Sequence, residues 1–342
     1  MNSDQRIAAF TRLGEVLASK LESGAADEAL ERAYHENNWF TVENSTKAIR
    51  AIINDFLNKE KLEKWLGRYN LVSNVSAPKS IGLVMAGNIP LVGWHDLLCV
   101  LITVNSAQIK LSSKDQTLPK LMINTLLEVE PGFENNIRIV ERLKDFDAII
   151  ATGSGNTMRY FEYYFGKYPH ILRMNRNAVA VLTGKETDEM LSGLGKDITE
   201  YYGLGCRNVS KLFVPEGYDF PVFFRAIEHY NTIMDHFKYA NNYNYNKSLL
   251  LLNKEKHLDN GFMLLKESEA LASPISVLNY QYYKNTDNLI TDLEAEKDTI
   301  QCIVSMPGIF ENSVDFGQTQ RPQLWDYADG VDVIQFIKGL KN

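Results

Sequence analysis

Short apolar segments alternate with longer amphipathic ones through most of the chain after residue 79. The apolar segments lack a two-residue period, which is typical of strands buried on both faces. The segments between them place apolar residues three and four positions apart, as helices do. This alternation predicts an α/β protein with parallel, doubly wound sheets. We expect strands at residues 80–86, 108–111, 137–140, 148–151, 178–182, 211–214, 248–252, 263–266, 276–280 and 299–304.

The first 70 residues carry a different pattern. Apolar residues recur every three or four positions from residue 7 onwards, which predicts a helix. Two further helices are expected at 42–57, with Thr41 as the N-cap, and at 59–69. The polar aromatic segment 239–246 is expected to be a loop. The remaining helices are expected at residues 92–104, 118–129, 156–165, 188–202, 220–238 and 288–296, with a short one near the C-terminus.

The length of the chain suggests two domains, since 342 residues exceed the ~150 that are usual for one. The pattern of strands and helices restarts near residue 200. We therefore expect domains at 1–200 and 201–342, with the C-terminal segment a candidate to pack back on the first domain.

Composition excludes several classes of protein. Acidic residues outnumber basic ones by 43 to 36, and the net charge of −7 argues against a nucleic-acid binder. An anionic substrate remains possible, because a few cations or backbone amides can hold one. The N-terminus lacks the basic and apolar regions of a signal peptide. The longest apolar run, 97–104, is far shorter than the ~20 residues that cross a bilayer. We expect a protein of the reducing cytoplasm with no integral membrane segment.

Three widely spaced cysteines, Cys99, Cys206 and Cys302, fit neither a disulfide framework nor a zinc cluster. Cys99 and Cys302 lie inside apolar segments, where a free cysteine acts as a small hydrophobe. Cys206 instead follows Gly203-Leu204-Gly205, and glycines allow a substrate to approach closely. Arg207 comes next, and a nearby cation lowers the pKa of a thiol. Cys206 is either a nucleophile or an incidental residue of a glycine-rich turn.

Three loops follow predicted strands, at the sheet edge where ligands bind. Asn88 is either the N-cap of the next helix or a donor to a developing oxyanion. The turn Thr152-Gly153-Ser154 lacks the full G-x-G-x-x-G spacing, but its amides and hydroxyl can hold a phosphate. Lys110 ends the second strand, and Ser112 follows it. Lys110 either points to solvent or hydrogen-bonds a ribose or phosphate.

In order and spacing, these segments resemble the aldehyde dehydrogenase superfamily, and within it the long-chain acyl-CoA reductases (the LuxC-like fatty-acid reductases). Gly205-Cys206-x-x-x-Ser210, with Phe213-Val214-Pro215 after it, is similar to the nucleophile segment of the superfamily. The segments around Asn88, Lys110 and Thr152 are similar to its oxyanion asparagine, ribose-binding lysine and cofactor turn. Four further segments resemble the acyl-CoA reductase branch: 38–41, 62–66, 241–246 and 327–332.

The resemblance implies a role for each of these residues. Cys206 would be the nucleophile, and Asn88, with the backbone amide of Cys206, would bind the oxyanion. Residues 1–200 would form the N-terminal helices and a Rossmann-like cofactor domain, and 201–342 the catalytic cysteine domain. The cofactor would be NADPH or NADH, and a 2′-phosphate, which Lys110 and Ser112 would suit, favours NADPH. The cofactor-binding residues would be Lys110, Ser112, Thr152, Gly153 and Ser154.

The implied reaction reduces a long-chain acyl-CoA to the aldehyde through an acyl-cysteine, with release of coenzyme A. Aldehyde-oxidising members carry a glutamate base well before the nucleophile, and here that position falls near Arg173. Without a base to activate water, hydrolysis of an acyl-enzyme is slow, which favours a reductase. Two alternatives remain open: an acyl-phosphate reductase with the same cysteine chemistry, and a non-catalytic subunit of a fatty-acid reductase complex. The expected partners are acyl-CoA and a homo-oligomer or such a complex.

Overall fold

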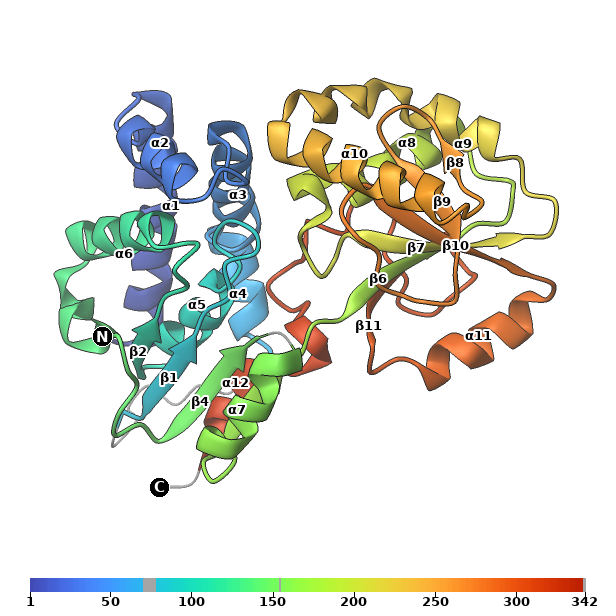
Figure 1. Ribbon diagram of the computed structural model, residues 1–342. Helices are drawn as coiled ribbons and strands as arrows, with labels where there is room; N and C mark the ends of the chain where they lie inside the picture. Colours follow the sequence, from blue (N-terminus) through green and yellow to red (C-terminus); the bar gives the residue numbers. More distant parts are fainter. Residues whose placement is uncertain (70–77, 154, 341–342) are drawn as a thin grey trace. The chain divides into compact units, whose positions relative to one another are not determined.

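The computed structural model describes residues 1–69, 78–153 and 155–340 (Figure 1). The chain divides into two compact units. Unit 1 comprises residues 1–175 and the C-terminal segment from Pro322, and unit 2 comprises Arg176–Arg321. The boundary expected at residue 200 lies too late in the chain. Strand β6 (Asn177–Val181) pairs with β7 (Val209–Pro215) of the second sheet, so it belongs to unit 2.

Unit 1 begins with four helices (Figure 1). Three of them lie where the sequence predicts helices, and the second was not predicted as a helix of its own. The stripe of α1 is fully buried at Phe10, Leu13 and Leu17. Thr41 caps α3 by accepting a hydrogen bond from the backbone N–H of Asn44 at 3.2 Å, as predicted. The helices are α1 (Ser3–Glu22), α2 (Asp27–Glu36), α3 (Val42–Asp55) and α4 (Lys59–Leu66).

The sheet of unit 1 is parallel throughout, with the strand order β3-β2-β1-β4-β5. The strand order reverses direction at β1, and open α/β sheets bind ligands at the carboxyl ends of the strands beside such a point. Strand β5 was not predicted. The strands are β1 (Ser80–Val84), β2 (Ser106–Lys110), β3 (Ile137–Ile139), β4 (Ala148–Thr152) and β5 (His170–Arg173), and the helices between them are α5 (Trp94–Ile102), α6 (Thr117–Val129) and α7 (Gly155–Phe165).

Unit 2 has a second doubly wound sheet, ordered β11-β6-β7-β10-β9-β8, in which only β8 is antiparallel among the described strands. Its remaining strands are β8 (Leu258–Asp259), β9 (Leu264–Glu267), β10 (Val277–Tyr283) and β11 (Ile300–Ser305). Its helices are α8 (Asp188–Thr199), α9 (Phe220–Ile227), α10 (Phe237–Leu252) and α11 (Thr286–Ala295), with 3₁₀ turns η2 (Glu200–Gly203) and η3 (Glu228–Asp235).

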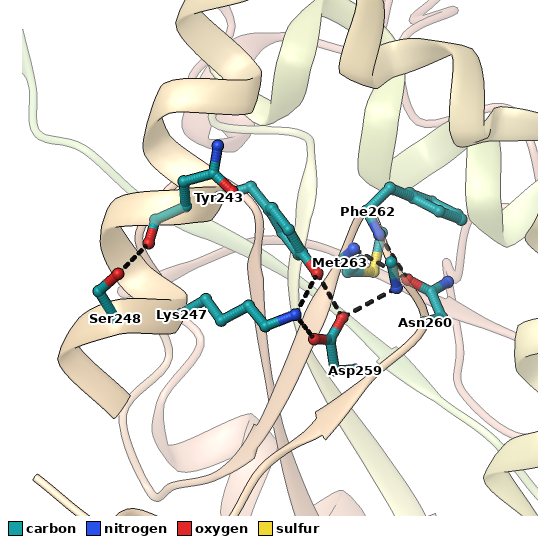
Figure 2. Close-up of polar contacts among 9 residues, drawn as sticks. Tyr243, Lys247, Ser248, Asp259, Asn260, Phe262 and Met263 are labelled. Carbon is teal, nitrogen blue, oxygen red and sulfur yellow. Dashed lines mark hydrogen bonds and ion pairs between the residues drawn. The ribbon is translucent and has the colours of Figure 1, made fainter. Parts of the chain in front are cut away.

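Helix α10 corrects two predictions, the loop at 239–246 and the strand at 248–252. Tyr239 and Tyr243 lie one helical turn apart and are both buried. The hydroxyl of Tyr243 donates to Oδ1 of Asp259 at 2.6 Å, and the ammonium of Lys247 lies 2.7 Å from Oδ2. Figure 2 shows both contacts. These tertiary contacts fix a helix in a segment whose asparagines favour turns. The apolar run 248–252, which was predicted to be a strand, lies at the end of this helix, and its last residue, Leu252, is exposed.

The C-terminal segment packs within unit 1 through its short helix α12 (Val333–Lys338), which buries Val333 and Ile334. The indole N–H of Trp65 donates to the hydroxyl of Tyr327 at 2.8 Å. The hydroxyl of Tyr69 donates to Asp332 at 2.6 Å. Segments 62–66 and 327–332, both of which resemble the acyl-CoA reductases, therefore meet in one partly buried cluster. Among the described helices, none is long and apolar enough to cross a membrane.

Candidate active site

The predicted cofactor residues and the predicted oxyanion asparagine gather at one edge of the first sheet. Parallel strands end on the same side, and each of these residues ends a strand or follows one. Lys110 is the last residue of β2 and Thr152 is the last residue of β4. Asn88, Ser112 and Gly153 follow β1, β2 and β4 respectively. Ser154 lies outside the described residues.

The loops after β1 and β2 are in direct contact. The backbone N–H of Met85 donates to the carbonyl of Lys110 at 3.1 Å. A Cβ built on Gly87 would lie 2.5 Å from Oγ of Ser112, which is closer than real Cβ atoms come. The glycine before Asn88 thus allows its loop to rest on the loop that carries Ser112.

A buried carboxylate that was not predicted ties these two loops together. Asp115 is 4% exposed, and its Oδ2 accepts a hydrogen bond from the backbone N–H of Leu91 at 2.8 Å. Leu91 has a φ of 59°, in the left-handed region that leucine rarely adopts. Oδ1 of Asp115 has no hydrogen-bond partner among the described residues. Burial raises the pKa of Asp115 to about 7, against the hydrogen bond from Leu91, which lowers it.

Gly153 is required by packing. Its backbone N–H donates to the carbonyl of Arg173 at 3.1 Å, and a Cβ there would lie 2.8 Å from the ring of Phe161. The glycine therefore lets α7 start close to β4. Because this amide already has a partner on β5, it is not available to a phosphate.

Arg173 ends β5 and is buried against helix α5. Its Nη1 donates to Oδ2 of Asp96 at 2.6 Å, and the two side chains are 6% and 13% exposed. Burial acts to lower the pKa of Arg173, but the ion pair with Asp96 outweighs it and raises the pKa. At the position where the resemblance expects the glutamate of aldehyde oxidisers, this chain therefore carries a paired cation.

Cys206 lies in unit 2, in the turn between η2 and β7, and is partly exposed. Three consecutive residues before it have left-handed backbones: Tyr201 at φ 50°, Tyr202 at φ 60° and Gly203 at φ 75°. Such strain in non-glycine residues is typical of functional sites and persists only where the surroundings impose it.

The side chain of Asn208 closes this turn. Its Oδ1 accepts from the backbone N–H of Gly205 at 2.8 Å, and its Nδ2 donates to the carbonyls of Asp197 and Glu200, both at 2.9 Å. Asn208 is itself buried. The turn that carries Cys206 is thereby held on the end of α8.

A segment following β11 also packs on the turn. The carboxylate of Asp197 accepts from the backbone N–H of Gly317 at 2.7 Å and from the N–H and hydroxyl of Thr319 at 3.0 and 2.9 Å. Nε of Arg207 donates to the carbonyl of Thr319. The side chain of Gln320 rests against Gly205. None of Asp197, Thr319 and Gln320 is marked by a sequence motif, because their partners are distant in the chain.

The other two cysteines lie in apolar surroundings, as expected. Cys99 is completely buried in α5, and burial raises the pKa of its thiol. Cys302 lies on β11, where burial raises the pKa of its thiol to about 11. Both groups are poor nucleophiles, since the thiolate is the reactive form.

Comparison with known proteins finds similarity both in sequence and in structure. No protein-family model matches the chain. Over 217 residues it is 23% identical to the long-chain acyl-protein thioester reductase of Aliivibrio fischeri. The match covers 58% of this chain and 45% of that protein, so it spans less than half of the relative's length.

Solved structures of aldehyde dehydrogenases are among those similar to this chain in fold. Aldehyde dehydrogenase 21 from Physcomitrella patens, in complex with succinate, has a TM-score of 0.65 at 13% identity, covering 89% of this chain and 73% of that one. The NADP-dependent glyceraldehyde-3-phosphate dehydrogenase of Bacillus halodurans C-125, complexed with NADP, also has a TM-score of 0.65 at 13% identity, covering 90% and 74%.

These similarities confirm the predicted fold class and the resemblance read from the motifs. Two doubly wound α/β units and a helical N-terminus are shared with the solved structures. The chain has an aldehyde dehydrogenase-like fold, and in sequence it is similar to the LuxC-like reductases of acyl thioesters.

Proposed function

We propose that this protein reduces a long-chain acyl thioester to the aldehyde, with a reduced nicotinamide nucleotide as the hydride donor and Cys206 as the nucleophile. The observation that carries the proposal is the turn around Cys206, where a partly exposed thiol follows a strained backbone braced by buried Asn208. The thioester reductase of A. fischeri supports the substrate class.

The proposed reaction needs no base that activates water. The Cys206 thiolate forms a bond to the carbonyl carbon, and the bond to the leaving thiol breaks as that thiol takes up a proton. A bound reduced nicotinamide supplies the hydride that converts the acyl-cysteine to aldehyde and free thiolate. The backbone N–H of Cys206 and the amide of Asn88 are the proposed donors to the oxyanion. The paired guanidinium of Arg173 cannot act as a base, which favours reduction over hydrolysis.

The carboxyl edge of the first sheet suits a nicotinamide nucleotide. Lys110 is exposed there and forms no ion pair among the described residues, and Ser112 supplies a hydroxyl on the adjoining loop. These two residues would hold the adenosine ribose, with Thr152 at the cofactor turn. A free ammonium suits a 2′-phosphate, so we propose NADPH over NADH.

A coupled assay with palmitoyl-CoA and NADPH tests the proposal. We expect free thiol and oxidised cofactor to appear in equal amounts, and intact-protein mass spectrometry to find the acyl group on Cys206. Cys206→Ala should lower turnover by at least about 10³-fold, because the covalent intermediate is lost. Cys302→Ala is the matched control and should keep the activity.

Each arm of the assay can contradict a part of the proposal. Turnover of an acyl phosphate without turnover of palmitoyl-CoA would replace the thioester as the substrate. Full activity of Cys206→Ala would exclude the nucleophile. Lys110→Met should raise the KM for NADPH more than that for NADH, and an equal rise would contradict a 2′-phosphate site at Lys110.

A further inference from the structure

The side-chain amide of Gln320 is buried, and its NH₂ group forms no hydrogen bond among the described residues. The side chain is 9% exposed, and the nitrogen of this group is Nε2. An amide N–H without a partner destabilises a folded protein, because it has lost its hydrogen bonds to water. Such groups are rare in native structures, and a role in function is one explanation for them.

This amide lies against Gly205, the residue that precedes the proposed nucleophile. A Cβ built on Gly205 would be 3.3 Å from Nε2 of Gln320 and 2.9 Å from Oδ1 of Asn208. The Gln320 amide therefore covers the side of Gly205 where other residues carry a side chain, one residue from Cys206. A substituent at position 205 would displace it.

The backbone on the N-terminal side of Gln320 is fixed. Thr319 is completely buried and bonded through its N–H and hydroxyl to Asp197. The carbonyl of Thr319 accepts from Arg207, which directly follows Cys206. The unpaired amide is thus held against the cysteine turn before any substrate binds, as a preorganised donor must be.

We propose that Gln320 is a catalytic residue whose Nε2–H donates to the carbonyl oxygen of the acyl group on Cys206. This inference rests on the proposed function. Negative charge builds on that oxygen when the thiolate attacks and again when hydride arrives, and a neutral amide stabilises it without adding a competing charge. Because the N–H has no partner to give up, no hydrogen bond is broken when the oxyanion forms.

The test compares Gln320→Met, which keeps the length of the side chain and removes the donor, with Gln318→Met, an exposed glutamine in the same segment. Single-turnover acylation of Cys206 by palmitoyl-CoA is followed by release of thiol. We expect Gln320→Met to slow acylation by about 10²–10³-fold, as loss of one oxyanion donor does. Gln318→Met should acylate at the wild-type rate.

Two further measurements separate this role from a structural one. Alkylation of Cys206 by iodoacetamide forms no oxyanion, so its rate should not change in Gln320→Met. The melting temperature should stay the same or rise, because an unpaired buried N–H is removed. If Gln320→Met fails to fold, Gln320→Leu, which also removes the N–H and adds no charge, takes its place with the same expectation.

The outcomes are distinguishable. Acylation of Gln320→Met within twofold of wild type would overturn the role of Gln320 and leave Cys206 as the nucleophile. A matching loss of acylation, alkylation and melting temperature would make Gln320 a structural residue. A wild-type protein acylated elsewhere than on Cys206, or not at all, would overturn the proposed function itself.

Discussion

Each unit buries one aspartate next to its proposed functional residues, and the two are bonded very differently. Asp115 in unit 1 accepts a single hydrogen bond and leaves one oxygen without a partner. Asp197 in unit 2 accepts three, from Gly317 and Thr319. Burial raises both pKa values, to about 7 for Asp115 and about 6 for Asp197.

The difference shows what each carboxylate does. The three bonds of Asp197 fix the segment that carries Gln320, and they favour the ionised form. The one bond of Asp115 holds the loop after Asn88 at Leu91, and the charge itself is poorly compensated. We therefore expect the same substitution to have opposite effects on stability in the two units.

Asp197→Asn should give the larger effect, a loss of about 2 kcal/mol in the free energy of unfolding at pH 8. The amide keeps one acceptor, but its NH₂ group faces the backbone N–H of Gly317 or Thr319, which loses its partner. Because Gln320 lies in the same segment, acylation of Cys206 should slow as well. Urea denaturation and single-turnover acylation measure the two effects.

The control for Asp197→Asn is Asp315→Asn, an exposed aspartate in the same region of the chain. It should change neither stability nor acylation. A fully stable Asp197→Asn protein would show that the three hydrogen bonds are not needed to hold the segment, and it would remove the contrast with Asp115.

Asp115→Asn should instead raise the free energy of unfolding, by about 1 to 2 kcal/mol at pH 8. The amide oxygen can still accept from Leu91, and no charge is buried. In the wild-type protein the folded pKa, about 7, lies above the value of 3.8 for an unperturbed aspartate. The stability that this carboxyl contributes is therefore complete below pH 4 and is lost as the pH rises to 7.

The gain from Asp115→Asn should consequently appear between pH 4 and pH 7 and stay constant above it, in melting temperatures measured across that range. Asp145→Asn is the control, because Asp145 is exposed and its φ of 53° suits asparagine equally well. A gain independent of pH would show that the buried charge of Asp115 is not its source.

Features that depend on local patterns could be predicted from the sequence, whereas features that depend on contacts between distant residues could not. Most strands and helices follow from local patterns, as Thr41 and the apolar stripe of α1 illustrate, whereas β5 and β8 were not predicted. The prediction of a loop and a strand over 239–252 was wrong because the helix there depends on the hydrogen bond from Tyr243 to Asp259. Local residue propensities carry no information about such a tertiary contact. The boundary at residue 200 was wrong because strand pairing, not spacing, assigns β6 to the second sheet.

For the candidate site, the sequence predicted residues that sit in recognisable loops, such as Asn88, Lys110 and Cys206. It did not predict Asp115, Asp197 or Gln320. Asp115 bonds a backbone N–H 24 residues away, and Asp197 bonds the segment that contains Gln320 from 120 residues away. Such pairs leave no periodic or motif signal in the chain, since only the fold brings them together.

Thr319→Val should give the smallest change in the free energy of unfolding, and it tests one of the three hydrogen bonds that distinguish Asp197 from Asp115. The change keeps the shape of a completely buried side chain and removes only the hydroxyl that donates to Asp197 at 2.9 Å. We expect a loss of about 1 kcal/mol at pH 8. It should be smaller at pH 5, where folded Asp197, with a pKa of about 6, is largely protonated.

Thr199→Val is the matched control, because that hydroxyl donates to the carbonyl of Gly195, which does not titrate. Its cost should be the same at both pH values, and an equal pH dependence in the two variants would mean that the hydroxyl of Thr319 does not stabilise the ionised form of Asp197.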